Sequence, residues 1–309
     1  MKKYTFIALT LVGAAPLSPA PASAPAPAPS EIVAAATAAE WVAIAPSDLL
    51  VMELASDAKG KPRRVVIQLM PPPFSQGWVG NIRKLAAANW WDGTSVNRVQ
   101  DNYVVQWGDA SEKKALPVGL ATVGESAYET TNVSQARAHA IGRTPPERDS
   151  YAQATGIFRG WPTATGKSYR YWPVHCYGMV GVGRNLSPDT GSGAELYTVI
   201  GHAPRHLDRN IALVGRVVEG IEHLSSLPRG SGTLGFYETA EERVQILSIR
   251  VATELPAAAR PRFEYLSTES ASFAKYADAR ANRRDPFFIR PAGGADICNI
   301  PVPVRRMKG

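Results

Sequence analysis

The chain has 309 residues, of which 45% are apolar and 20% charged, so it can bury a full hydrophobic core and is not a disordered protein. Its formal net charge is +7, but the excess lies at the two ends: Lys2 and Lys3 at the start, and seven basic against two acidic residues over 280–309. The 25 basic and 25 acidic side chains between them cancel. This distribution argues against a nucleic-acid-binding protein. It leaves the narrower hypothesis that the basic tail makes a weak contact with an acidic partner or surface.

Residues 1–24 are typical of a secretory signal peptide. Lys2 and Lys3 precede an apolar run from Tyr4 to Ala15, and small residues follow. The run is too short to cross a bilayer, and no later segment offers the roughly 18 apolar residues of a membrane span. We therefore expect a periplasmic or secreted protein without a membrane span. The cleavage site stays open, because proline follows both candidate Ala-x-Ala sequences.

Residues 25–46 are rich in proline and alanine and predict an extended tether, in which the stretch 30–44 could form a short helix. Beyond residue 47, apolar runs of strand length, separated by turn residues, predict strands. They cover 49–54, 64–69, 95–100, 103–107, 177–182, 195–200, 211–218 and 243–251.

Two helices are predicted between these strands. Ser75 is a candidate N-cap for a helix that ends near Asn89, with apolar residues at Trp78, Ile82 and Leu85, and a short helix is expected over 219–224. The region from 110 to about 174 is polar and rich in glycine and proline, with helical stretches around 133–140, and is too long for an ordinary connection. Many strands and two helices favour a β-barrel or sandwich with helical covers.

The two cysteines, Cys176 and Cys298, allow only one disulfide. An exported protein permits that bond, and two separate thiols are the alternative. The sequence leaves both open.

Three motif-like patterns fail on their spacing. Residues 160–168 resemble a phosphate-binding loop but have five residues between the glycines where four are required. His202 and His206 are four apart, but Pro204 between them breaks a helix and no acidic third ligand is near, so a surface loop is expected and no metal site. The serine of residues 191–193 lies outside a Gly-x-Ser-x-Gly nucleophile elbow.

Two ordered segments resemble the cyclophilin-type peptidyl-prolyl isomerases. The first runs from Trp91-Asp92-Gly93-Thr94 through Arg98-Val99 to Gln106-Trp107-Gly108-Asp109, with an aromatic residue, Tyr103, five positions after the arginine. The second contains residues 191–200, then Leu207-Asp208, then 214–220. The resemblance covers about residues 47–252, apart from an insertion at about 110–177, and it leaves out the C-terminal extension 253–309.

The resemblance implies a mainly β fold, a closed eight-stranded antiparallel barrel capped by two helices. It implies an enzyme that accelerates X-Pro bond rotation in folding or unfolded exported proteins; the alternative is a proline-segment binding module or holdase with little catalysis. By the same resemblance Arg98 is the catalytic cation and Gln106 its orienting partner. The substrate-binding residues are Tyr103, Val104, Tyr197, His206 and Leu207, although ordinary barrel packing would also account for the two tyrosines.

The chemistry fits these residue types. Amide resonance opposes rotation with a barrier of about 18–20 kcal/mol, and no nucleophile, metal or cofactor is needed to lower it. An apolar pocket can hold the proline ring while a fixed cation stabilises the twisted amide. Arginine suits that role because it stays charged and carries a planar fork of donors.

Hairpin geometry gives a check on this assignment. A two-residue loop at Asp101-Asn102 would pair Arg98 with Val105, whereas a three-residue loop pairs Arg98 with Gln106. We predict the three-residue loop, with Asn102 in the left-handed conformation.

Several positions depart from the family pattern. His206 stands where many eukaryotic members have tryptophan, which should weaken the binding of cyclosporin-like inhibitors, and Ile211 stands where they have a pocket histidine. Glu195 replaces a glutamine, and it could either alter substrate hydrogen bonding or reduce activity.

Overall fold

The computed structural model describes residues 25–131 and 149–307. The predicted signal peptide and the helical stretch expected around 133–140 lie outside these residues.

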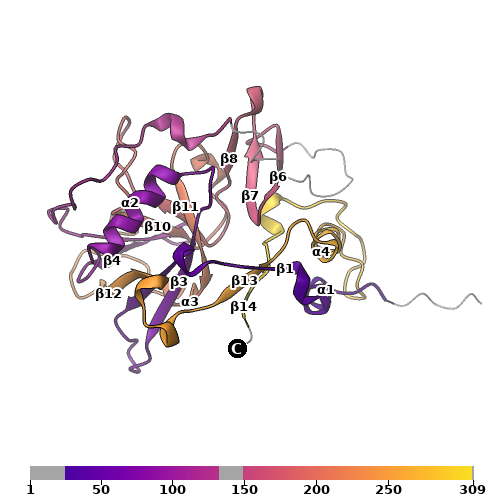
Figure 1. Cartoon of the computed structure of the whole chain (residues 1–309), viewed down its shortest axis with the longest axis horizontal. Helices are drawn as coiled ribbons and strands as arrows, with labels where there is room; N and C mark the ends of the chain where they lie inside the picture. The colour runs from indigo at the N-terminus through magenta and orange to yellow at the C-terminus, as the bar shows by residue number, and fades with distance from the viewer. Residues whose placement is uncertain (1–24, 132–148, 308–309) are drawn as a thin grey trace, which may run out of the picture.

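Eight strands close into an antiparallel barrel, as expected (Figure 1). Around the barrel the order is β10-β5-β4-β12-β2-β3-β11-β9. In chain order the strands are β2 (Leu49–Leu54), β3 (Arg63–Leu69), β4 (Ser95–Val99), β5 (Val104–Gly108), β9 (Met179–Val182), β10 (Leu196–Val199), β11 (Leu213–Glu219) and β12 (Val244–Val251). Each corresponds to one of the eight predicted strands, because alternating apolar residues are readable from the sequence alone.

The two predicted helices are present. α2 (Gln76–Ala87) buries Trp78, Ile82 and Leu85 completely and lies against β11 and β12, while α3 (Glu222–Ser225) contacts β3. Ser75 is the N-cap residue of α2, as predicted, but its φ of 55° is left-handed and its side chain makes no capping hydrogen bond.

The insertion contains a sheet that the sequence did not predict. β6 (Ala154–Phe158), β7 (Trp161–Thr165) and β8 (Tyr171–Pro173) form three antiparallel strands, seen beside the barrel in Figure 1. Trp161 and Trp172 are almost completely buried. These two buried indoles form part of a core that the polar composition of the region did not suggest.

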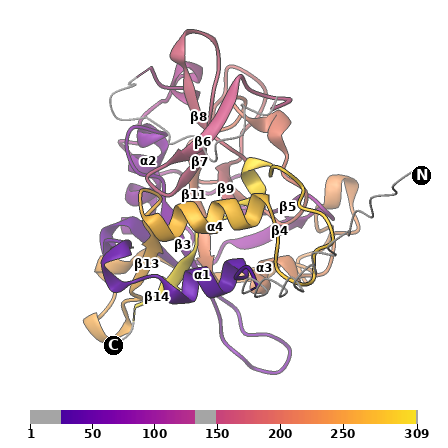
Figure 2. The same ribbon diagram turned by 90° about the vertical axis from the view of Figure 1, so that its right-hand side faces the viewer.

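Both ends of the chain pack together. α1 (Pro29–Ala35) lies along α4 (Ala271–Ala281), and β1 (Trp41–Ala43) forms a second three-stranded sheet with β13 (Phe263–Leu266) and β14 (Val304–Arg306) (Figure 2). Residues 29–43 therefore belong to the folded unit, which begins where the proline-rich run ends. The helix foreseen within 30–44 is α1.

Much of the basic tail is already neutralised within the fold. Arg305 pairs with Glu264 and Arg306 with Glu219, while Arg283 and Arg284 pair with Asp285 and Asp278. The two cysteines form a disulfide with an S–S distance of 2.05 Å, which resolves the alternative that the sequence left open. Among the described residues, no helix is both long and apolar enough to cross a membrane.

Candidate active site

Three of the predicted site residues form one row across the barrel wall. Arg98 of β4 lies opposite Gln106 of β5, and Gln106 lies opposite Tyr197 of β10. Opposite residues of an antiparallel pair project from the same face of the sheet. The barrel interior is filled instead by neighbours such as Val105 and Trp107, which are fully buried, so the row lies on the outer face.

The predicted hairpin is confirmed. Gln100 donates its backbone N–H to Val104, which leaves a three-residue loop, and Asn102 has a φ of 50°. Arg98 therefore pairs with Gln106 and not with Val105.

A bulge in β4, which the sequence analysis missed, gives Arg98 its direction. Val96 pairs with Trp107 and Arg98 with Gln106, so Asn97 is an extra residue in the strand. Strict alternation from the buried Val96 would point Arg98 into the barrel, and the extra residue reverses that alternation. Because of the bulge, the side chain of Val96 lies inside the barrel and that of Arg98 lies on its outer face.

Arg98 is held from several sides. Its Nη1 donates to Oε1 of Gln106 at 3.2 Å, its Nη2 donates to Gln100, and its Nε donates to the carbonyl of Leu234 at 2.8 Å. Its guanidinium carbon lies 5.2 Å from the centre of the Phe236 ring. Since a guanidinium has five N–H donors, two are left for a substrate carbonyl.

The electrostatics of Arg98 favour a fixed cation. Burial lowers its pKa, and a nearby tyrosine, Tyr103, opposes that effect. Arginine begins from so high a pKa that it stays charged at neutral pH. The partly desolvated charge acts more strongly on a substrate dipole than it would in water.

An apolar cluster adjoins this row. Val104, Tyr197 and Val199 are buried, and Tyr103, Leu207 and Ile211 pack on them while partly exposed. The exposed His206 stacks on Tyr103 with 6.4 Å between ring centres. All five residues predicted to bind substrate therefore lie together, with Ile211 completing the cluster. A partly open apolar surface of this kind can receive a proline ring.

A cavity of about 750 Å³ lies on the other side of Arg98 and Gln106. Glu195, Gly183 and Phe236 contribute to its lining. Space for part of a bound peptide is therefore present beside the cation.

Glu195 is the most strongly perturbed carboxyl of this cavity. Burial raises its pKa to about 7, and the charges of Asp109 and Glu112 add to that rise, whereas hydrogen bonds from the Gln106 side chain and the Asp109 backbone lower it. A Cβ atom at Gly108 would lie 1.8 Å from Oε1 of Glu195, so only glycine leaves room for this carboxyl. The carboxyl of Glu195 thus contacts Gln106, the residue that accepts a hydrogen bond from Arg98.

Sequence reasoning missed the loop that covers Arg98. Leu234 and Phe236 come from residues 233–236, more than 130 positions further along the chain. Three glycines nearby, at 230, 232 and 235, were the only signal of a close backbone approach. The described residues contain no group of three or more His, Cys, Asp or Glu side chains that could hold a metal ion.

Comparison with known proteins decides the family. The sequence model for cyclophilin-type peptidyl-prolyl cis-trans isomerases matches residues 62–251, more than half of the chain. The chain belongs to this family. It is a cyclophilin-type peptidyl-prolyl isomerase, and proline-containing peptides are the substrates of that family.

One solved structure agrees on the fold. The cyclophilin AquaCyp293 from Hirschia baltica is 22% identical, with a TM-score of 0.67 over 86% of this chain and 93% of that one. Residues 62–251 make up less than 86% of this chain. The structural similarity therefore extends into segments outside the family domain. A cyclophilin-type isomerase from Cryptosporidium parvum, solved with the dipeptide Ala-Pro, is 12% identical and reaches a TM-score of 0.37 over 65% of this cyclophilin and 98% of its own chain. No curated protein matches the chain.

Proposed function

We propose that this cyclophilin isomerises X-Pro bonds of folding or unfolded exported proteins, with Arg98 stabilising the twisted amide. The observation that carries the proposal is the row of Arg98, Gln106 and Tyr197 beside the apolar cluster. A proline ring seated on Tyr197 and Leu207 would bring its amide close to the cation. No atom is transferred and no bond is broken in this mechanism.

The contribution of Arg98 is electrostatic. As the amide twists, resonance is lost and the lone pair localises on the proline nitrogen, where a donor stabilises it. Gln106 holds the guanidinium in place, so the cation needs little reorganisation in the transition state. Each 1.4 kcal/mol of selective stabilisation gives about tenfold in rate.

An isomerisation assay on a short X-Pro peptide tests this proposal. We expect activity in the wild type and a loss of at least about tenfold in kcat/KM for Arg98→Ala, since the charge stabilises the twisted amide more than the planar one. Arg64→Ala, which removes a partly exposed arginine of β3 that pairs with Glu53, is the matched control and should keep full activity. Thermal melts of each variant separate loss of folding from loss of catalysis.

The assay also separates the enzyme from a binding module. Peptide binding without any rate enhancement in the wild type would favour the module or holdase. Equal activity in the wild type and Arg98→Ala would refute the role of the cation.

The exported location is a proposal with two supports. One is the signal-like segment 1–24, and the other is the Cys176–Cys298 disulfide, a bond that persists in oxidising compartments. Fractionation of cells that produce the full chain tests it: we expect a shortened protein outside the cytoplasm, and full-length protein in the cytoplasm would refute it.

A weak contact between the basic tail and an acidic partner or surface is also proposed. Since Arg305 and Arg306 already pair within the fold, the exposed Arg290 is the residue best placed to carry it. Arg290→Glu should weaken binding to anionic vesicles at low salt, and unchanged binding would argue against the contact.

A further inference from the structure

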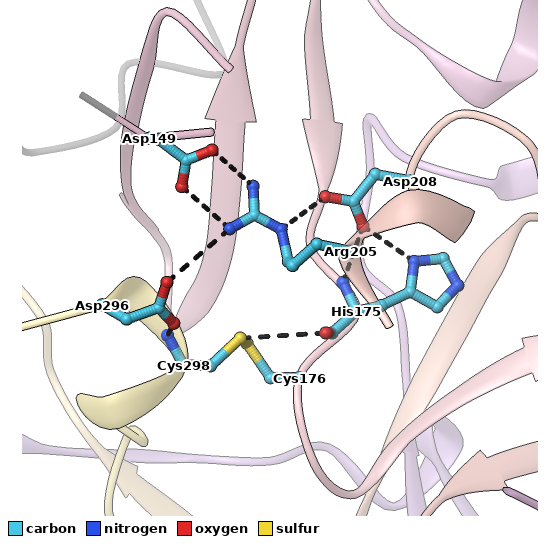
Figure 3. The surroundings of a disulfide bond; sticks show 7 residues. All are labelled: Asp149, His175, Cys176, Arg205, Asp208, Asp296 and Cys298. Atoms are coloured by element: carbon cyan, nitrogen blue, oxygen red, sulfur yellow. Dashed lines mark hydrogen bonds and ion pairs between the residues drawn. A yellow bond between two sulfur atoms is a disulfide. The ribbon is translucent and has the colours of Figure 1, made fainter. Parts of the chain in front are cut away.

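A buried hydrogen-bonded chain lies behind the apolar cluster. His175 is completely buried, and its Nε2 lies 2.8 Å from the hydroxyl of Tyr197, while its Nδ1 lies 2.8 Å from Oδ1 of Asp208. The backbone N–H of His175 donates to the same oxygen at 2.9 Å (Figure 3). The side chain of His175 thus connects Tyr197 of the apolar cluster to the carboxylate of Asp208.

The directions of these hydrogen bonds follow from the protonation states. Burial lowers the pKa of His175, in spite of Asp208, and raises that of Tyr197 well above its ordinary value, so both are neutral near pH 7. A carboxylate only accepts, so Nδ1 carries the proton and donates to Asp208. Nε2 is then the acceptor, and the Tyr197 hydroxyl donates to it.

Ion pairs fix the acidic end of this chain. Arg205, which is 4% exposed, donates through Nε to Asp208 at 2.7 Å and through both terminal nitrogens to Asp149 at 2.9 and 3.1 Å. Asp296 lies 4.0 Å from the same guanidinium and accepts the backbone N–H of Cys298. Figure 3 shows how the disulfide brings the C-terminal extension to this group.

The same group anchors a second wall residue. Leu207 lies between Arg205 and Asp208, within one short turn (Arg205–Leu207), so both of its flanks are held by buried bonds. Tyr197 and Leu207 come from separate elements, and His175 with Asp208 is what connects them.

The strand beside Tyr197 leaves room for its ring. Opposite Tyr197 on β9 is Gly181, where a Cβ would lie 2.3 Å from the hydroxyl oxygen. The glycine lets the ring lie flat over the strand. The single hydrogen bond to His175 is the directional contact that sets where the hydroxyl end rests.

We propose that His175 is a positioning residue of this isomerase, which holds Tyr197 and, through Asp208, the Leu207 turn, so that the proline-binding wall is formed before substrate arrives. Tyr197 and Leu207 touch the substrate, and His175 acts only through them. A pre-formed wall costs less ordering on binding. This wall contacts the proline ring of the substrate equally well when the amide is planar and when it is twisted. Loss of the pre-formed wall therefore raises KM and leaves kcat nearly unchanged.

A double-mutant cycle tests the inference on the full chain. We expect Tyr197→Phe, which removes only the hydroxyl, to raise KM for a short X-Pro peptide at least threefold with kcat within twofold of the wild type. His175→Leu should raise KM about tenfold in the wild-type background but at most about threefold in the Tyr197→Phe background, because its bond to the hydroxyl is already absent there and only its bond to Asp208 remains to be lost. His175→Gln, whose amide oxygen can accept from Tyr197, should recover part of the loss.

The outcomes discriminate clearly. Equal losses for His175→Leu in both backgrounds would show a merely structural role and overturn the proposal. If His175→Leu does not fold, Tyr197→Phe alone decides: a KM equal to that of the wild type refutes the positioning role. The inference rests on the proposed proline site, and an inactive wild type would refute that site itself, whereas an active wild type with an indifferent Tyr197→Phe refutes only the inference.

Discussion

Replacing Glu195 by glutamine should change how the stability of the protein depends on pH. The folded protein raises the pKa of this carboxyl from 4.5 to about 7, chiefly by burial. Between these two values the folded state keeps a proton that the unfolded state releases, so the wild type loses stability as pH rises from about 4.5 to 7. Above pH 7 both states are ionised and the loss is complete.

The size of this effect follows from the two pKa values. At about 1.4 kcal/mol for each pH unit, a rise from 4.5 to about 7 corresponds to roughly 3 kcal/mol. Partial exposure of the carboxyl reduces this to about 2–3 kcal/mol. Glutamine has the same shape and does not titrate, so Glu195→Gln should gain about 2–3 kcal/mol over the wild type between pH 4.5 and 8.

Urea unfolding of both proteins at several pH values measures this difference, and subtraction cancels every group that the two share. Glu238→Gln removes a carboxyl from the exposed surface and is the control for the loss of one negative charge. A difference between Glu195→Gln and the wild type that is independent of pH would refute the reasoning.

Three further predictions concern the surrounding structure. Cys298→Ser opens a bond that spans 122 residues, and we expect a loss of up to about 5 kcal/mol of unfolding free energy, measured in denaturant; an unchanged midpoint would contradict it. Gly181→Ala should displace Tyr197 and raise KM about tenfold, whereas Gly80→Ala, where a Cβ meets nothing, should stabilise the helix by up to about 1 kcal/mol; similar effects of both on KM would contradict the packing argument. His206→Trp should tighten a cyclosporin-like inhibitor about tenfold in a binding titration, because a larger ring would cover the exposed edge of the cluster, and equal affinity would contradict this.

The strands were predictable because each carries its own signal, whereas their closure into a barrel was expected only from the family resemblance. Alternation of apolar residues marks each strand locally, and the turn residues between them mark the ends. The pairing of Arg98 with Gln106 also followed from a local count, since the length of one hairpin loop decides the register. The family resemblance, and not this count, predicted Tyr103 beside the cation, and its ring centre lies 5.7 Å from the guanidinium carbon of Arg98.

The supporting structure could not be predicted in this way. The three-stranded sheet of the insertion depends on Trp161 and Trp172, whose burial only the folded chain defines. The pairing of β1 with β13 joins residues more than 200 positions apart, and nothing in either short segment specifies its partner. The bulge at Asn97 is likewise invisible to a rule that assumes strict alternation.

By itself the sequence determined the strand pattern, the neutral centre between two basic ends, and the spacing of Arg98, Tyr103 and Gln106. Each of these is a property of neighbouring residues. Only the tertiary structure decided that Cys176 and Cys298 are bonded and that the terminal segments pack on one another. It alone joined His175 to Tyr197, since contacts between distant segments depend on the burial that the whole fold creates and leave no local pattern in the chain.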